Sequence, residues 1–401
     1  MKTPIRFLSS LGLSLGLLAA CGGGGGDGDA SSPGSPGNPQ TNSPDFVPTT
    51  GPVTVTELAT GLPSPWGLAF LPDARMLVTG RTGTLRLYAA NGQSFANISL
   101  NGLSGLTTNG QGGLMDVVVD PAFNSNRRIY FTFSEVDSGN ANLNGTAVAQ
   151  AELDTGALTL LNLQVIYRQT PKVASGGHFG SRLVFDRDGH LFVTLGDRQN
   201  ADQSPFAQDL SRGNGKVVRI TTSGAAAPGN PIFSSAQTGI WSYGHRNPQG
   251  ATLGPDGKLW MHEHGPQGGD EINVPQPGRN YGWPVITYGE NYGGGQIGDG
   301  ITSKPGLEQP LHYWKPSIAP SGMAFVKSDR YGKDWQGNLL VGSLKFRYLA
   351  RLDISGGRVV KEERLLPDLG ARVRDVREGP DGFIYLLTDE RNGRLLRLLP
   401  G

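Results

Sequence analysis

The 401-residue sequence contains a single cysteine, Cys21, so no disulfide can form within one chain. Its 35 Lys and Arg residues nearly balance its 34 Asp and Glu residues, and nucleic-acid binding normally needs a basic excess. No segment keeps a helical period of apolar residues, and no Gly-x-Gly-x-x-Gly motif follows a strand and opens a helix. These absences argue against a helical fold, a nicotinamide-binding fold and a nucleic-acid partner.

The first residues have the composition of an export signal. Lys2 and Arg6 precede an apolar run from Phe7 to Ala20, which is too short for a good membrane span and ends directly before Cys21. The sequence Leu-Ala-Ala-Cys resembles the processing site of bacterial lipoproteins, so we expect residues 1–20 to be a signal peptide and Cys21 to be lipidated. Gly22 stands where an Asp would indicate inner-membrane retention. The resemblance therefore favours an exported protein anchored by lipid to the outer membrane, on its periplasmic face or at the cell surface.

Two further parts follow the cysteine. Residues 21–52 are mostly Gly, Ser, Pro, Asn and Asp, and such a segment cannot offset its ordering entropy by burying apolar surface. We expect a flexible linker there and a single folded domain over residues 53–401, which contain no second long apolar run.

One pattern recurs six times in the folded part: an apolar strand, a turn rich in Asp and Gly, and a second apolar strand. The copies are WGLAFLPDARMLVTG from Trp66, LMDVVVDPAFNSNRRIYFTFS from Leu114, SRLVFDRDGHLFVTLGD from Ser181, ATLGPDGKLWMHEHG from Ala251, GMAFVKSDRYGKDWQGNLLVGS from Gly322 and DVREGPDGFIYLLTDE from Asp375. Their spacing suits one four-stranded blade per copy. The sequence predicts an all-β, six-bladed β-propeller. A β-sandwich or a two-domain all-β protein is the less favoured alternative, because those folds demand no sixfold repeat. We expect residues 394–399 to close the ring against residues 53–58.

Six polar motifs lie in the segments that link these hairpins: NGQGG, GGHFGSRL, GHRNPQG, GPQGGDEINVPQPGRNYGWP, PSIAPSGMAF and RVRDV. In this order they resemble the soluble aldose sugar dehydrogenases that depend on pyrroloquinoline quinone (PQQ), relatives of soluble quinoprotein glucose dehydrogenase in the glucose/sorbosone dehydrogenase family. The resemblance implies oxidation of the C1 hydroxyl of an aldose to the lactone, by hydride transfer to calcium-bound PQQ.

The resemblance also assigns catalytic residues. His178, in GGHFGSRL, matches the family's general base, and an imidazole that titrates near neutrality suits removal of a hydroxyl proton. Asp197, at the end of the next predicted strand, matches the carboxylate that bonds this imidazole and raises its basicity. Arg246, in GHRNPQG, matches a residue at the reacting centre and in the cofactor shell.

PQQ carries three carboxylates, so its site needs cations, and Arg makes forked contacts with carboxylates. The residues that match family cofactor contacts are Gln111, Arg246, Asn247, Tyr292, Lys345, Arg372 and Arg374. Arg372 and Arg374 are two residues apart, which places both on one face of an extended strand.

The resemblance implies two calcium sites. The backbone carbonyls of Gly265 and Pro266 match the ligands of the catalytic ion, for which backbone oxygen is a suitable hard ligand. Glu271 and the Tyr281 carbonyl match a second, structural site, where Asp270 could substitute or assist. His262 and His264 invite a zinc interpretation, which lacks a recognisable third ligand and is not favoured.

Two other functions remain open from the residues alone. A calcium-dependent propeller hydrolase such as a lactonase would also use oxygen ligands and a histidine, but it would not need several arginines. A non-catalytic binding propeller would suit a lipid anchor but would leave GHRNPQG and GPQGGDEIN unexplained. Lys315 directly precedes Pro316 where the glucose enzymes have an aromatic-rich segment, so we expect a shallow site that accepts several aldoses. The sequence names neither the preferred sugar nor the electron acceptor nor the oligomeric state.

The anchor assignment gives the first prediction. Cys21→Ser should move the protein from the membrane fraction to the soluble fraction and leave sugar oxidation unchanged, because the linker separates the anchor from the domain. Detergent partition compares the two proteins. A mutant that still partitions with membranes would show that Cys21 is not the attachment point.

Overall fold

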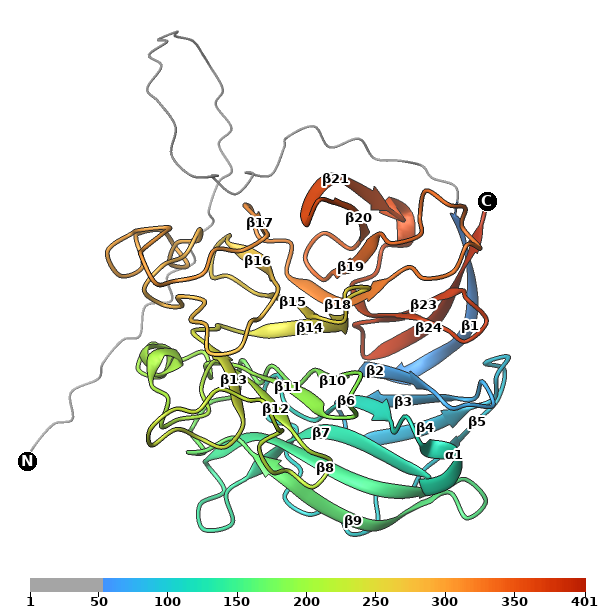
Figure 1. Ribbon diagram of the computed structural model, residues 1–401. Helices are drawn as coiled ribbons and strands as arrows, with labels where there is room; N and C mark the ends of the chain where they lie inside the picture. The colour runs from blue at the N-terminus through green and yellow to red at the C-terminus, as the bar shows by residue number, and fades with distance from the viewer. Residues whose placement is uncertain (1–52) are drawn as a thin grey trace, which may run out of the picture. The chain divides into compact units, whose positions relative to one another are not determined.

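A computed structural model describes residues 53–401, so the predicted signal peptide, Cys21 and the linker lie outside the described residues. The described part is almost entirely β and contains six four-stranded antiparallel sheets. Figure 1 shows these sheets arranged around a common axis, with β2, β6, β10, β14 and β18 near the centre. The predicted six-bladed β-propeller is confirmed.

Each blade is built from strands that follow one another in the chain, except the last, which takes β1 as its outer strand. The bounds are β1 Val53–Pro63, β2 Pro65–Phe70, β3 Met76–Gly80, β4 Thr84–Tyr88, β5 Phe95–Asn97, β6 Leu114–Val119, β7 Arg128–Val136, β8 Asn144–Asp154, β9 Thr159–Arg168, β10 Leu183–Phe185, β11 Leu191–Leu195, β12 Lys216–Ile220, β13 Ile240–Tyr243, β14 Pro248–Leu253, β15 Leu259–Glu263, β16 Asp270–Asn273, β17 His312–Trp314, β18 Pro320–Phe325, β19 Leu339–Ser343, β20 Leu349–Ser355, β21 Arg358–Leu365, β22 Val373–Glu378, β23 Ile384–Thr388 and β24 Asn392–Pro400. The helical segments within residues 53–401 are short: α1 Phe123–Asn126, η1 Ser204–Gln208 and η2 Pro367–Leu369. No helix of this part is long and apolar enough to cross a membrane.

The six sequence repeats form the two inner strands of the six blades. Their turns have a shared cause, since an Asp side chain accepts a hydrogen bond from the backbone N–H two residues later. This bond occurs at Asp73, Asp186, Asp256 and Asp381, with distances of 3.1, 2.9, 3.1 and 3.2 Å. The local chemistry of these four turns therefore helps to close four of the six inner hairpins.

The ring closes where the sequence predicts. β1 pairs antiparallel with β24 in the register Val53↔Pro400 to Pro63↔Asn392, interrupted by two irregularities. The first strand of the domain thus becomes the outer strand of the last blade, which removes two free sheet edges from the ends of the chain.

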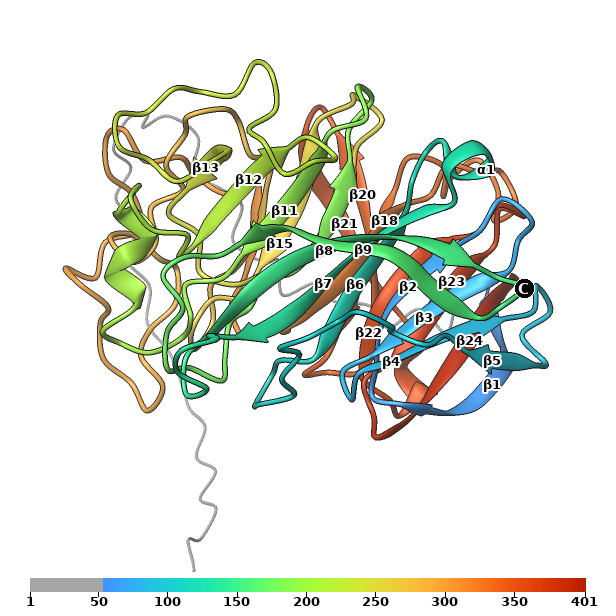
Figure 2. The ribbon, with the colours of Figure 1, turned by 90° about the horizontal axis from the view of Figure 1, so that it is seen from below.

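The apolar core is divided among the blade interfaces. Six clusters of buried side chains each join two neighbouring sheets. Seen from below, the sheets stack face to face around the ring (Figure 2). A small seventh cluster comprises Trp66 of β2, Met115 of β6 and Phe179 before β10. This cluster brings inner segments of three blades together near the axis.

Candidate active site at the propeller axis

A cavity of about 210 Å³ lies beside the Trp66, Met115 and Phe179 cluster. Its walls come from inner strands and loops of several blades, and its lining residues are Trp66, Arg81, Gln111, Met115, Phe179, Asn247, Gln249, His264, Ala319, Leu344, Arg372, Arg374 and Asp389. Four of the predicted cofactor residues, Gln111, Asn247, Arg372 and Arg374, are therefore brought to one cavity.

The charge of the cavity wall is mainly positive, because three arginines face one carboxylate. Arg372 Nη2 lies 2.7 Å from Asp389 Oδ2, and Arg374 Nη2 lies 2.9 Å from Asp389 Oδ1. Burial opposes ionisation of Asp389, but the charges of Arg374 and Arg372 outweigh it and lower its pKa to about 2. The carboxylate is thus ionised at neutral pH and orients both guanidinium groups, while the third arginine, Arg81, adds a further positive charge.

His178 and Asp197 form a buried pair beside this cavity. His178 Nδ1 lies 2.7 Å from Asp197 Oδ1, and the two side chains are 6% and 0% exposed. The His178 backbone N–H donates to Gln111 Oε1 at 2.9 Å, which fixes Gln111 at the cavity wall. Gly196 allows its own segment to approach the His178 backbone closely, because a Cβ atom at position 196 would lie 2.0 Å from the His178 carbonyl oxygen.

The pKa values of the pair define their charge. Burial lowers the pKa of His178; Asp197 opposes this, and the charges of Arg246 and Arg198 add to the lowering. Burial alone would raise the pKa of Asp197, but the hydrogen bond and charge of His178 outweigh it and lower that pKa. A neutral imidazole at pH 7 that donates from Nδ1 to a carboxylate has a free lone pair on Nε2. The sequence predicts a His178 that titrates near neutrality. In the structure the pKa of His178 is lowered, so the imidazole stays unprotonated to a lower pH.

Asp197 accepts three further hydrogen bonds. Its Oδ1 accepts one from the Gln199 backbone N–H at 2.8 Å. Its Oδ2 accepts one from Ser204 Oγ and one from Trp283 Nε1, both at 2.7 Å. Four donors from different segments therefore hold this carboxylate in one orientation.

Arg246 connects the pair to the predicted metal ligands. Its carbonyl accepts a hydrogen bond from the Asp197 N–H at 2.8 Å, and its Nη1 donates to the Gly265 carbonyl at 2.6 Å. Its guanidinium carbon lies 5.2 Å from the centre of the Trp283 ring. The neighbouring Asn247 accepts from the Gly180 N–H at 3.3 Å and from Gln249 Nε2 at 3.2 Å.

The Gly265-Pro266 turn is tightly folded. A Cβ atom at Gly265 would lie 2.2 Å from the Gly268 carbonyl oxygen, so only glycine fits there. Asp270 holds the turn by accepting from the Gly265 N–H at 2.9 Å and also from Ser317, Ile318 and Ala319. Both Asp270 oxygens are therefore engaged by donors of the protein, and burial raises the pKa of Asp270 to about 6.

Glu271 lies on the strand next to Glu263, with which it is paired across β15 and β16. Burial and the neighbouring Glu263 charge raise the pKa of Glu271 well above its ordinary value. Asn273 Nδ2 donates to both carboxylates, at 3.0 and 3.2 Å, and His245 joins the cluster by bonding Glu263 and stacking on Tyr281. The structure thus brings Glu271 and Tyr281 into one buried acidic neighbourhood.

Three predicted cofactor residues do not line the cavity: Arg246, whose contacts are given above, and the surface residues Lys345 and Tyr292. Lys345 is exposed and lies directly after the lining residue Leu344, with its Nζ 5.2 Å from the Phe346 ring centre. Tyr292 is 72% exposed, on a loop tied to Gln267 by backbone bonds to Glu290. Contact with a bound molecule would require these two surface side chains to reach inward.

Sequence reasoning missed several lining residues. Trp66 and Phe179 read as core positions, Gln249 belongs to a matched motif, and Asp389 reads as an ordinary turn residue. His264, considered above only for zinc, is buried, which lowers its pKa to about 3, and its Nε2 lies 2.7 Å from the Pro320 carbonyl. The signal for Arg81 and Asp389 is their position at the ends of the inner hairpins.

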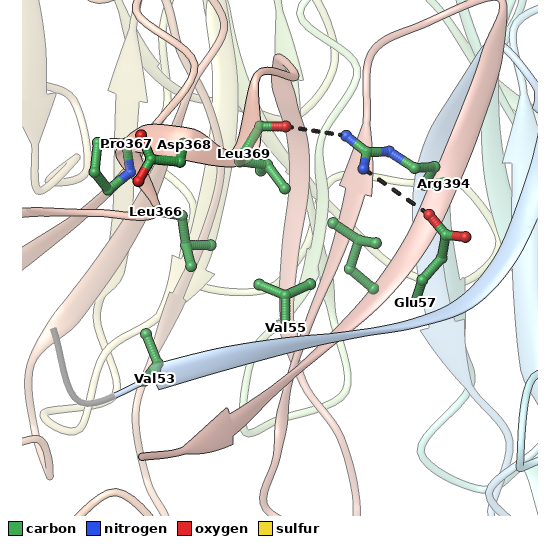
Figure 3. A pocket seen from close by; sticks show the side chains of 9 residues that line it. Val53, Val55, Glu57, Leu366, Pro367, Asp368, Leu369 and Arg394 are labelled. Carbon is green, nitrogen blue, oxygen red and sulfur yellow. Dashed lines mark hydrogen bonds and ion pairs between the residues drawn. The ribbon is translucent and has the colours of Figure 1, made fainter. Parts of the chain in front are cut away.

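Larger cavities lie away from these residues. A cavity of about 590 Å³ sits at the outer edge of the last blade, between β1 and η2, where Arg394 contacts Glu57 and Leu369 (Figure 3). Another, of about 680 Å³, is lined by polar residues from Tyr331 to Glu363. Neither contains a predicted site residue, so chemistry rather than volume identifies the axial cavity.

The fold and the cavity define a six-bladed β-propeller with one cationic site at its axis, beside a buried His–Asp pair. A model of the glucose/sorbosone dehydrogenase family matches residues 62–397, and the chain belongs to that family. It is 46% identical to an aldose sugar dehydrogenase of Escherichia coli over 87% of this chain and 93% of the relative.

Solved structures agree. The apo form of the soluble aldose sugar dehydrogenase from Escherichia coli matches with a TM-score of 0.82 and 45% identity, over 87% of this chain and all of that one. The PQQ-bound aldose sugar dehydrogenase from Streptomyces coelicolor matches with a TM-score of 0.71 and 26% identity, over 88% of this chain and all of that one.

The pairing of Asp389 with two arginines gives a prediction of stability. Asp389→Asn should lower the free energy of unfolding at pH 7 by about 2 to 3 kcal/mol, because the wild-type pKa lies about two units below that of an unfolded Asp. The wild-type contribution is present above about pH 4 and is lost as the pH falls toward about 2. Urea unfolding followed by tryptophan fluorescence measures it. The control Asp368→Asn, at an exposed position, should change stability by less than about 0.5 kcal/mol, and equal stabilities for the two variants would contradict the prediction.

Proposed function

We propose that this protein oxidises the C1 hydroxyl of aldose sugars to the lactone, with PQQ and calcium as cofactors and His178 as the general base. The observation that carries the proposal is the axial cavity, in which Arg81, Arg372 and Arg374 face a single carboxylate beside a neutral, carboxylate-bound imidazole. Membership of the family and the similarity to a PQQ-bound relative support it.

The residues present fit a polyanionic quinone. Arg374 is buried and held by Asp389, Gln249 and Ser321, so its guanidinium is already oriented. Arg246 Nε is buried and has no hydrogen-bond partner within residues 53–401, which leaves a donor for an acceptor from a ligand. Arg246, Asn247, Arg372 and Arg374 would hold the cofactor, with Gln111 at the same wall and Lys345 and Tyr292 reaching in from the surface.

The residues present also fit calcium. At the first proposed site, the Gly265 carbonyl oxygen accepts one hydrogen bond, from Arg246, and keeps a second lone pair, and the Pro266 carbonyl is a further hard oxygen ligand. At the second, half-buried Glu271 lies beside Glu263, and its pKa is raised. A divalent cation would relieve that repulsion, with the Tyr281 carbonyl as a further oxygen ligand.

The chain's own groups perform the proton chemistry. Asp197 keeps the proton of His178 on Nδ1, so Nε2 is the atom that takes the proton from the anomeric hydroxyl. As that O–H bond breaks, its electrons form the C1 carbonyl, and the hydrogen on C1 leaves with its electron pair. PQQ, held by Arg246, Asn247, Arg372 and Arg374, would supply the hydride acceptor, and calcium, held by the Gly265 and Pro266 carbonyls, would supply a Lewis acid.

We also propose that the enzyme is exported and anchored by lipid at Cys21, most simply to the periplasmic face of the outer membrane. The family resemblance of the Cys21 segment supports this, and the fractionation of Cys21→Ser described above tests it.

The reconstitution of activity tests the cofactors. The protein purified without metal should oxidise an aldose, with reduction of an artificial dye, only when PQQ and calcium are added together. Each addition alone, or NAD in place of PQQ, should give no activity above the blank. Dye reduction with NAD after rigorous removal of quinone would contradict the proposal, and lactone hydrolysis without an electron acceptor would favour the hydrolase.

The base is tested by His178→Gln. Turnover should fall by roughly a hundredfold to ten-thousandfold, because loss of a general base costs that much, whereas quinone absorbance on reconstitution should not change. His190→Gln is the control, because His190 lies in the turn between β10 and β11, at the opposite end of β11 from Asp197 and beside Arg219, and its turnover should match wild type. A His178→Gln enzyme with more than about a tenth of wild-type turnover would exclude this base.

A further inference from the structure

Trp283 touches both halves of the proposed site. Its indole N–H donates to Asp197 Oδ2 at 2.7 Å, and its ring face lies 5.2 Å from the guanidinium carbon of Arg246. Trp283 is therefore a neighbour of two groups of the site. One is Asp197, which orients His178, and the other is Arg246, which donates to the Gly265 carbonyl.

The position of the indole is fixed by its backbone. Trp283 belongs to the long loop between β16 and β17 of the fourth blade, yet its backbone N–H donates to the Gly244 carbonyl of the third blade at 2.9 Å. Its carbonyl accepts from Gln208 Nε2 at 2.7 Å. Both backbone groups of Trp283 are thus bonded to the blade that carries Asp197, and the residue as a whole is only 9% exposed.

The second donor to the same oxygen has a different neighbourhood. Ser204, in η1, donates to Asp197 Oδ2 at 2.7 Å. Ser204 donates to Asp197, whereas Arg246 donates to the Gly265 carbonyl. The serine therefore holds the carboxylate without holding the arginine. With the bonds from His178 and Gln199, Asp197 has four donors and is saturated as an acceptor.

We propose that Trp283 is a positioning residue that fixes the distance and orientation between the His178–Asp197 pair and Arg246, through its indole N–H on one side and its ring face on the other. This inference rests on the proposed role of His178 as base. It adds that a single side chain couples the proton-accepting pair to the cofactor-binding arginine.

Two substitutions separate the two contacts. Trp283→Phe removes the N–H donor and keeps a ring face for Arg246, whereas Trp283→Leu removes both. Ser204→Ala is the matched variant that removes one donor to Asp197 Oδ2 and leaves the ring in place. Circular dichroism and urea unfolding establish that each variant is folded before any comparison.

Trp283→Phe and Ser204→Ala should lower kcat by roughly tenfold or more, as loss of an outer hydrogen-bonding partner commonly does, and should leave KM and PQQ affinity close to wild type. The acid limb of the pH profile of kcat/KM should move to higher pH in both. A donor lost from Asp197 leaves more negative charge beside His178 and so favours the imidazolium. Trp283→Leu should in addition weaken PQQ binding, measured by titration of quinone absorbance.

A measurement without activity separates this inference from the proposed function. In the cofactor-free protein, the pKa of His178 can be read by NMR, with its signal assigned by its absence in His178→Gln. That pKa should rise in Trp283→Phe and Ser204→Ala even if the sugar dehydrogenase proposal fails. An unchanged His178 pKa together with wild-type kcat in Trp283→Phe would overturn the inference, as would equal losses of PQQ affinity in Trp283→Phe and Trp283→Leu.

Discussion

The buried guanidinium of Arg182, directly before β10, ties the blades together at the axis. It donates to the Gln249 carbonyl at 2.7 Å, lies 3.1 Å from Asp116 Oδ1 and 3.0 Å from Asp375 Oδ1, and stacks 4.1 Å from the Trp66 ring centre. These partners belong to four blades other than its own. Removal of such a guanidinium would leave buried carboxylates without their full partners, a loss of about 3 to 5 kcal/mol. The geometry of the axis therefore depends on this one charge cluster.

The site inherits that geometry. Trp66 and Gln249, which contact Arg182, also line the cavity, and Gln249 Oε1 accepts from Arg374 Nη1 at 3.1 Å. Arg182 therefore helps to orient Arg374 through Gln249, since Arg182 bonds the Gln249 carbonyl and Arg374 bonds the Gln249 side chain. Because the whole chain carries a net charge of only +1, the positive character of the cavity is local and comes from arginines held in place by Asp389 and Gln249.

The sequence predicts the fold well because its signals are local. Alternating strands and Asp turns repeat within short windows, so six inner hairpins follow without knowledge of tertiary contacts. His178 and Asp197 are found through matched motifs, and the structure brings them together. By contrast, Arg182 and Trp283 act through partners such as Asp375 and Asp197, which are 193 and 86 residues away in the chain. No local pattern marks such contacts, and the exposure of Lys345 and Tyr292 likewise depends on how distant loops pack.

The positive charges of the site have two effects that reinforce each other. Arg246 and Arg198 both lower the pKa of His178, in the same direction as burial, so the imidazole stays neutral and able to accept a proton at neutral pH. Asp197, the carboxylate bound to His178, is held by four donors of the protein. The arrangement therefore allows a positive site and a neutral base to coexist, because the carboxylate that orients His178 is fixed by donors of the protein and not by a ligand.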